Sequence, residues 1–233
     1  MASLTATQIG YVLLTGLVPS VIWLFFWLQV DDKKEPRGLL FLCFILGGAS
    51  VLFATKLQHA AAAFATTDTS RIAIFAGIEE VLKFIVFYLI AYHNDYDDEA
   101  IDPALYLITV ALGFAALENI FYVLQPIAHS QITASLLTGG MRFFGSTLLH
   151  TIASCFIGIS IGLASPRNRP LAILGGLIGA IFLHTTFNFF ILKNDTASFL
   201  QIYGYLWVAA IISHVILEKL RRIPTPGALS PSL

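Results

Sequence analysis

Charged residues are scarce in this chain of 233 residues. Asp, Glu, Lys and Arg together make up 12% of it, whereas a soluble domain carries about 25%. The hydrophobic fraction is 57% and the mean hydropathy is +0.81. A soluble globule needs more charged residues than this on its water-facing surface. We therefore expect the chain to lie in a lipid bilayer. The formal net charge of -1 gives no basic surface for nucleic acid, so we expect no nucleic-acid partner.

Cysteine is nearly absent, and positive charge is missing at the start of the chain. Cys43 and Cys155 lie far apart in apolar runs, so they form neither a disulfide framework nor a metal-binding spacing. Residues 1–7 contain no Lys or Arg, and the first apolar stretch is longer than the core of a signal peptide. We therefore expect that stretch to be a membrane span.

Long apolar stretches alternate with short polar breaks along the whole chain. A span needs about 20 mostly apolar residues, and the breaks contain prolines such as Pro36, Pro103 and Pro170. The pattern predicts an all-α, polytopic transmembrane helical bundle of about seven spans. The spans are expected near 9–30, 38–58, 71–93, 102–124, 143–164, 169–192 and 199–217.

The breaks are too short for a soluble domain, and the sequence contains no repeat. We therefore predict a single membrane-embedded domain over residues 1–222. Residues 125–140 are mildly polar and are expected to form a loop or a re-entrant segment. Residues 223–233 are rich in proline and are expected to be a disordered tail.

The distribution of Lys and Arg predicts the orientation of the chain in the membrane. With the N-terminus outside, eight of these residues fall on the cytoplasmic side, four fall on the other side, and Lys83 lies within a span. Cytoplasmic loops carry the excess of positive charge. We therefore expect an outside N-terminus and a cytoplasmic C-terminus.

Three ionisable residues, Glu79, Glu80 and Lys83, lie inside the third predicted span. Each charge at the centre of a span costs about 2.5–3.5 kcal/mol on insertion scales. Lys83 follows Glu79 by four residues and Glu80 by three, so it can meet either carboxylate on a helix. Because one lysine cannot neutralise two acids, a purely structural role does not account for the group, and we expect a functional one.

The next three spans also carry polar residues. One buried His or Asn alone is most often an interhelical hydrogen bond. In the fifth span, however, Ser146, His150 and Ser154 follow Arg142 at a spacing of four and form one polar stripe. The fourth span carries Glu118, Asn119 and Tyr122, and the sixth carries His184 and Asn188.

Four of these residues are expected at the same depth in the membrane. Glu79 and His150 lie seven or eight residues after the start of their spans, and Glu118 and His184 lie six or eight residues before the end of theirs. Successive spans run in opposite directions, so at 1.5 Å per residue each lies roughly 9–12 Å below the same membrane face. Independent hydrogen bonds have no reason to share a depth. The pattern therefore indicates one buried hydrolytic site.

At these residues the sequence resembles the PrsW family of intramembrane proteases, within the wider CAAX-protease and bacteriocin-processing superfamily. The matching motifs are Glu79-Glu80-Val81-Leu82-Lys83, Gly113 to Tyr122 with Glu118-Asn119 inside it, Arg142 ahead of His150, and His184-Thr185-Thr186-Phe187-Asn188. The CAAX-protease branch has His where this chain has Glu118, which favours the PrsW branch.

The resemblance implies an intramembrane endopeptidase that hydrolyses a peptide bond of a membrane-anchored protein. PrsW-type enzymes resemble site-1 proteases that cut membrane-anchored anti-sigma factors, so a substrate of that kind is possible. The implied location is a plasma membrane of the bacterial type.

The residues themselves suggest a glutamate-dependent mechanism. Glu79 or Glu80 would take a proton from water, and His150, or His184 helped by Asn188, would stabilise the oxyanion. The remaining Glu or His, including Glu118, would protonate the leaving amine. Lys83 would keep one carboxylate ionised, with Asn119, Tyr122 and Arg142 as supporting residues.

Two alternatives remain open at this point. A zinc-dependent form of the same hydrolysis would take its ligands from Glu80, Glu118, His150 and His184. No compact His-Glu-x-x-His motif is present, so the expectation from sequence is a site without a metal cofactor. An ion-coupled carrier could also use buried Glu and His, although the sequence contains no inverted repeat.

Overall fold

The computed structural model describes residues 5–92, 94–128, 140–193 and 196–223. These residues are almost entirely helical and contain no strand, so the all-α prediction is confirmed. The long helices are α1 (Ala6–Leu28), α2 (Arg37–Ala61), α3 (Asp68–Ile90), α4 (Asp102–Ala128), α6 (Ser146–Gly162), α7 (Arg169–Lys193) and α8 (Thr196–Leu220). Two short 3-10 helices, η1 (Ala62–Phe64) and η2 (Pro166–Asn168), follow α2 and precede α7.

The seven long helices of the described residues correspond to the seven predicted spans. The largest difference in a boundary is the end of α4, which continues to Ala128 instead of ending near residue 124. Residues 140–144 are helical and lead through Gly145 into α6. Most of the predicted 125–140 loop and all but one residue of the predicted tail lie outside the described residues.

Helix α3 differs from the other long helices in its charge. The other six described helices, with residues 140–144 counted with α6, are long and apolar enough to cross a membrane. Helix α3 has 23 residues, which is sufficient length, but it carries Glu79, Glu80 and Lys83. All three side chains are buried within the bundle, which keeps their charges away from lipid.

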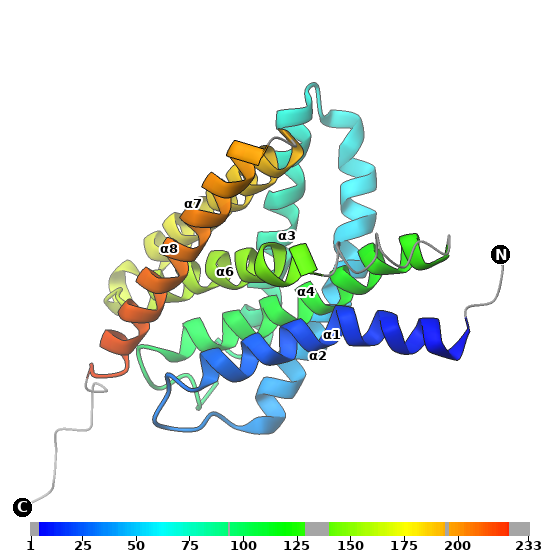
Figure 1. Ribbon diagram of the computed structural model, residues 1–233. Coiled ribbons are helices and arrows are strands. Elements are labelled where there is room, and N and C mark those ends of the chain that lie inside the picture. Colours follow the sequence, from blue (N-terminus) through cyan, green and yellow to red (C-terminus); the bar gives the residue numbers. More distant parts are fainter. Residues whose placement is uncertain (1–4, 93, 129–139, 194–195, 224–233) are drawn as a thin grey trace, which may run out of the picture.

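Helices α4 and α6 form the centre of the bundle (Figure 1). About two thirds of the α4 span and 78% of the span ending in α6 are buried, compared with 22–28% for α1, α2, α7 and α8. The outer helices therefore turn apolar side chains such as Phe25, Phe53 and Phe182 away from the protein, as lipid contact requires.

Small residues allow α2 and α4 to pack closely. A Cβ atom on Gly47 would overlap the carbonyl group of Val110, and one on Gly113 would overlap the carbonyl group of Phe44. Glycine at these two positions lets the two backbones touch. Because α2 continues directly into the turn before α3, this contact also places α3 beside α4.

Candidate active site

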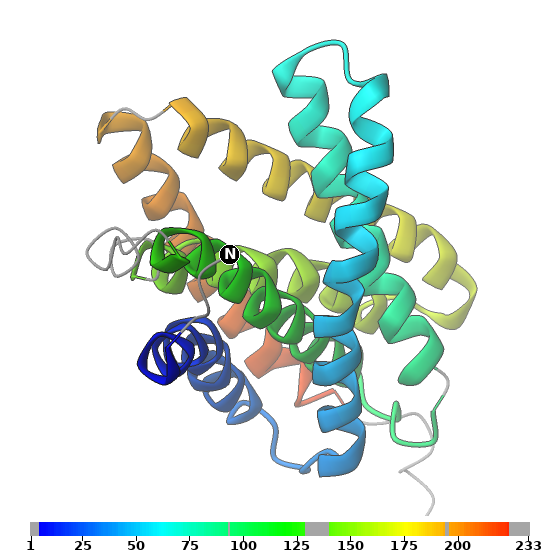
Figure 2. The ribbon, with the colours of Figure 1, turned by 90° about the vertical axis from the view of Figure 1, so that its right-hand side faces the viewer.

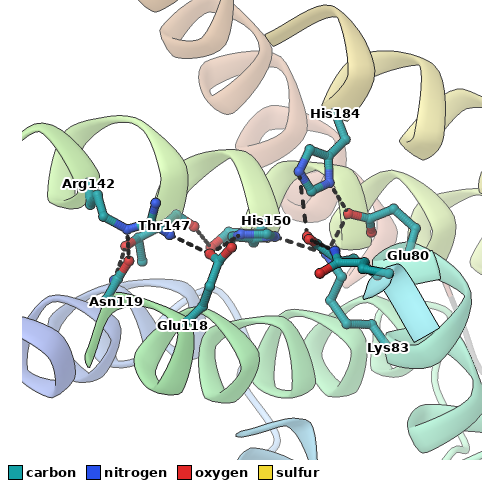
Figure 3. Close-up of polar contacts among 11 residues, drawn as sticks. Glu80, Lys83, Glu118, Asn119, Arg142, Thr147, His150 and His184 are labelled. Atoms are coloured by element: carbon teal, nitrogen blue, oxygen red, sulfur yellow. Dashed lines mark hydrogen bonds and ion pairs between the residues drawn. The ribbon is translucent and has the colours of Figure 1, made fainter. Parts of the chain in front are cut away.

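Glu80 lies at the centre of a buried polar cluster formed by α3, α6 and α7 (Figure 3). Lys83 Nζ donates to Glu80 Oε1 at 2.5 Å, and His184 Nδ1 lies 2.7 Å from the same oxygen. Glu80 and Lys83 are completely buried. Because the carboxylate accepts, His184 carries its proton on Nδ1 when it is neutral, and the lone pair on Nε2 is available to another partner.

Glu79 faces a cavity, whereas its neighbour Glu80 does not. Glu79 Oε1 accepts a hydrogen bond of 2.7 Å from Gln58 Nε2 on α2. The other oxygen, Oε2, is buried without a hydrogen-bond partner and lies 3.6 Å from His184 Nε2. An unpaired carboxylate oxygen thus faces the lone pair of an imidazole, and this arrangement is completed by a proton or by a cation.

His150 connects the Glu80 cluster to a second ion pair. Lys83 Nζ lies 3.1 Å from His150 Nδ1, and His150 Nε2 lies 3.0 Å from Glu118 Oε2. The lysine donates, so neutral His150 holds its proton on Nε2 and donates it to Glu118. Glu118 also pairs with Arg142. A continuous row of polar contacts therefore runs from Arg142 to His184 (Figure 3).

Arg142 contacts Asn119 and Tyr122 besides Glu118, and Thr147 supports Asn119. Its Nε donates to Asn119 Oδ1 at 2.5 Å, and Asn119 Nδ2 donates to Thr147 at 2.9 Å. Its guanidinium group lies 4.0 Å from the centre of the Tyr122 ring, a cation–π contact. Thr147 was not among the residues predicted from sequence.

A cavity of about 730 Å³ opens onto this row of polar residues. The walls are otherwise mainly apolar and aromatic, as in most sites that bind organic ligands. The polar side chains that line the cavity are Thr55, Gln58, Arg71, Glu79, Glu118, Tyr122, Arg142, Ser146, His150, His184, Asn188 and Tyr203.

The structure brings the sequence-derived candidates together around one cavity. Glu79, Glu118, His150, His184 and Asn188 line it. Glu80 and Lys83 lie behind that wall, and Asn119 supports it through Arg142. Sequence reasoning missed Gln58, because a single glutamine near the end of a span has no distinctive spacing.

Three side chains of the described residues could hold a metal ion together. Glu79, His150 and His184 each offer a ligand atom, and these atoms lie within 4.8 Å of one another. This set contains Glu79 in place of the Glu80 and Glu118 that the sequence suggested. A carboxylate and two imidazoles match a His₂Glu zinc site, and the unpaired Glu79 Oε2 and the lone pair of His184 supply two of the donors. The residues present therefore fit a zinc ion.

The net charge of the site is also compatible with a bound metal ion. Glu79, Glu80 and Glu118 bring three carboxylates, and the cations that contact this group, Lys83 and Arg142, bring two permanent positive charges. The remaining negative charge is buried and is neutralised by a proton or by a bound cation.

Comparison with known proteins places this chain in a family. A family model described as "PrsW family intramembrane metalloprotease" matches residues 35–216, which include every candidate site residue. A protein of Geobacillus kaustophilus named "Protease PrsW" is 27% identical over 186 residues, covering 77% of this chain and 79% of its own length. Relatives with the same name in Oceanobacillus iheyensis and Bacillus subtilis are 28% and 25% identical, over 86% and 82% of this chain and 93% and 88% of their own lengths.

No solved structure matches the chain. The family model covers most of the sequence, and the described helices are those of a multi-pass membrane protein. The chain belongs to the PrsW family of intramembrane metalloproteases.

Proposed function

We propose that this protein hydrolyses a peptide bond of a membrane-anchored protein at the cavity between α2, α3, α4, α6 and α7. The observation that carries the proposal is the unpaired carboxylate oxygen of Glu79, which faces His184 Nε2 in a cavity that also contains His150, Glu118 and Arg142. A carboxylate and an imidazole in this position can hold and deprotonate a water molecule beside a bound peptide.

We further propose that Glu79, His150 and His184 hold a zinc ion. When bound, zinc would polarise the scissile carbonyl group and make its own water more acidic. The family description and the Glu–His–His cluster favour this form over the metal-free form that the sequence alone favoured. Both nitrogens of His150 have partners, so His150 would exchange its contact with Lys83 or with Glu118 when it becomes a ligand.

The residues behind the cavity wall position the groups that line it. Glu80 accepts from His184 Nδ1, which holds Nε2 toward Glu79, an arrangement often found behind metal-binding histidines. Lys83 balances the charge of Glu80. Gln58 holds one oxygen of Glu79, so the other oxygen remains directed at His184.

Two further residues of the cavity would receive the substrate carbonyl group. Arg142 and Asn188 line the cavity and carry N–H donors that can bind a developing oxyanion. Glu118 holds Arg142 in place and itself lines the cavity, so it is suited to take a proton from the attacking water and to give it directly to the leaving amine. Asn119 and Tyr122 keep the guanidinium group oriented.

The substrate proposed here is a protein with a membrane anchor, cut by a site-1-type cleavage, and an anti-sigma-factor-like protein is one example. Residues 1–222 act as a single membrane-embedded domain in a plasma membrane of the bacterial type, with the N-terminus outside. Placement in the wider CAAX-protease superfamily remains part of the same proposal. The family match favours a protease over the ion-coupled carrier considered from the sequence.

The test uses purified protein in lipid vesicles with a library of single-span reporter proteins, each bearing eight random residues beside its span. Cleaved reporters are identified by mass spectrometry before chelation, after exhaustive chelation and after zinc is returned, and the metal content is measured in the same samples. We expect about one zinc per chain, cleavage lost with the metal, and cleavage restored with it. Full cleavage by metal-free protein would overturn the zinc proposal and leave Glu79 as the base. No cleavage of any reporter by zinc-loaded protein would overturn hydrolysis itself.

A further inference from the structure

A second cavity adjoins the one that contains the site residues. Its volume is about 490 Å³, and its lining consists of Asp68, Thr69, Arg71, Ile72, Phe189 and Leu192. Three of these residues, Arg71, Ile72 and Leu192, also line the first cavity. The two cavities are therefore neighbours that share one wall.

The second cavity lies where α3 and α7 separate. The two helices meet near the centre of the molecule, where His184 contacts Glu80 and Ile181 lies 4.0 Å from the Cβ position of Gly77. From there they diverge toward the start of α3 and the end of α7 (Figure 2). The lining residues come from those two ends, so the second cavity is an opening between the start of α3 and the end of α7.

The chemistry of the opening combines apolar walls with one cation, Arg71, and one carboxylate, Asp68. Ile72, Phe189 and Leu192 offer apolar surface, and Leu192 is 68% exposed. Arg71 lines both cavities, and more than half of its side chain is exposed. The ion pair of Arg71 with Asp68 is long, at 3.8 Å, which leaves most of its donors for another partner.

We propose that this opening is the route by which the substrate enters from the membrane, and that Arg71 selects an acidic residue in the entering segment. The inference rests on the proposed function. The occupant is an extended segment of the membrane-anchored substrate, with an apolar side chain against Phe189 and Leu192 and a carboxylate at Arg71. A segment in this position continues directly into the cavity that contains Glu79 and His184.

A charge-reversal experiment tests the selection. The reporter library with eight random residues is treated with the unchanged protein and with the Arg71→Glu, Arg71→Gln and Lys56→Glu variants. Lys56 is the matched control, because it is an exposed cation at the end of α2 near the same membrane face and does not line either cavity.

We expect the unchanged protein and Lys56→Glu to prefer an acidic residue at one fixed distance from the cleaved bond. Arg71→Gln should lose that preference, and Arg71→Glu should prefer a basic residue there. At that position of the cleaved reporters, the ratio of acidic to basic residues should change by about fivefold to tenfold. The change is modest because Arg71 is partly exposed. Cleavage by Arg71→Gln with unchanged preferences would overturn the selection, and absence of cleavage by the unchanged protein would instead count against the proposed function.

Photo-crosslinking tests the route itself. Benzoylphenylalanine is placed at Phe189 or Ile72, or at Leu14 as a control, in a Glu79→Gln background that keeps the reporter uncleaved. Leu14 is an exposed apolar residue of α1, away from both cavities. We expect crosslinks to a cleavable reporter from positions 72 and 189, and none from position 14. Crosslinks to lipid alone, or equal crosslinking from position 14, would overturn the route.

Discussion

At the scale of single residues, Glu80 and Lys83 form a buried pair in which each charge depends on the other. Both are completely buried, and their charged atoms are 2.5 Å apart. Removing one partner of such a pair leaves an uncompensated charge and costs about 3–5 kcal/mol. We therefore predict that Glu80→Gln and Lys83→Met each lower the free energy of unfolding by about that amount. Unfolding in detergent, followed by temperature or denaturant, measures the change.

The double variant distinguishes this pairing from two independent contributions. Glu80→Gln combined with Lys83→Met removes both charges and should be more stable than either single variant. A double variant that loses the sum of the two single losses would show that the two residues do not compensate each other.

Gln58 belongs to the site although it lies outside the sequence motifs. It donates to Glu79 at 2.7 Å and fixes the direction of the free oxygen. Loss of a residue that orients a metal ligand typically costs 10–100-fold in metal affinity or activity. We predict that Gln58→Leu lowers zinc affinity and cleavage rate by about that range. Thr55→Val, which changes another α2 side chain of the same cavity, is the control and should leave both values nearly unchanged.

The sequence was sufficient to predict the cluster of site residues but not the role of each residue in it. Intramembrane charge and equal depth were sufficient to predict that Glu79 or Glu80, Glu118, His150 and His184 lie together, because ionisable residues are rarely left in lipid. The sequence could not separate Glu79 from Glu80. Adjacent residues point in different directions on a helix, and only the packing of α3 against α7 decides which one faces the cavity.

At the scale of helices, the contact between α2 and α4 depends on two glycines. A Cβ atom on Gly113 would overlap the carbonyl oxygen of Phe44, a backbone atom that cannot move away. Overpacking of this kind costs about 1–3 kcal/mol. We predict that Gly113→Ala lowers stability by about that amount and lowers cleavage as well, because Glu118 lies just over one turn further along α4.

Gly175 on α7 provides the comparison for this prediction. Nothing lies within 4 Å of its Cβ position. Alanine has a better helix propensity than glycine, by about 0.5–1 kcal/mol. Gly175→Ala should therefore be neutral or slightly stabilising in the same unfolding measurement. Equal losses for the two variants would contradict the account of close packing.

The helices themselves were largely predictable because their signals are long and redundant. Stretches of about 20 apolar residues, ended by prolines and charges, defined all seven to within a few residues. The extension of α4 to Ala128 was not predictable, because residues 125–128 are no more apolar than a loop. The burial of α4 and α6 at the centre was also not predictable, because the outer helices are equally apolar.

At the scale of the whole molecule, the Lys and Arg distribution predicts which membrane side each loop occupies. A cysteine in place of Asp68, whose side chain is 92% exposed, should react with an impermeant reagent added from outside. A cysteine in place of the exposed Asp95 should react only after the membrane is permeabilised. Both native cysteines are buried and should add little background. The reverse pattern would invert the orientation and place the site near the cytoplasmic face.

The arrangement of the whole bundle is what turns separate motifs into a site. Alternating helix directions bring residues from four helices to one level, which the sequence could indicate. The cavity and the opening between α3 and α7 depend on helix crossing, which no local pattern encodes. Peptide hydrolysis at the level of Glu79 and His184 is the activity that we propose for the assembled site.

The most direct measurement of that activity compares new protein termini in membranes. Membranes from cells that produce the unchanged protein, Glu79→Gln, His184→Gln or Thr55→Val are analysed by mass spectrometry, and folding of each variant is checked by its unfolding temperature. We predict new termini in membrane-anchored proteins with the unchanged protein and with Thr55→Val, and none with folded Glu79→Gln or His184→Gln. The same new termini with all four proteins would contradict this prediction.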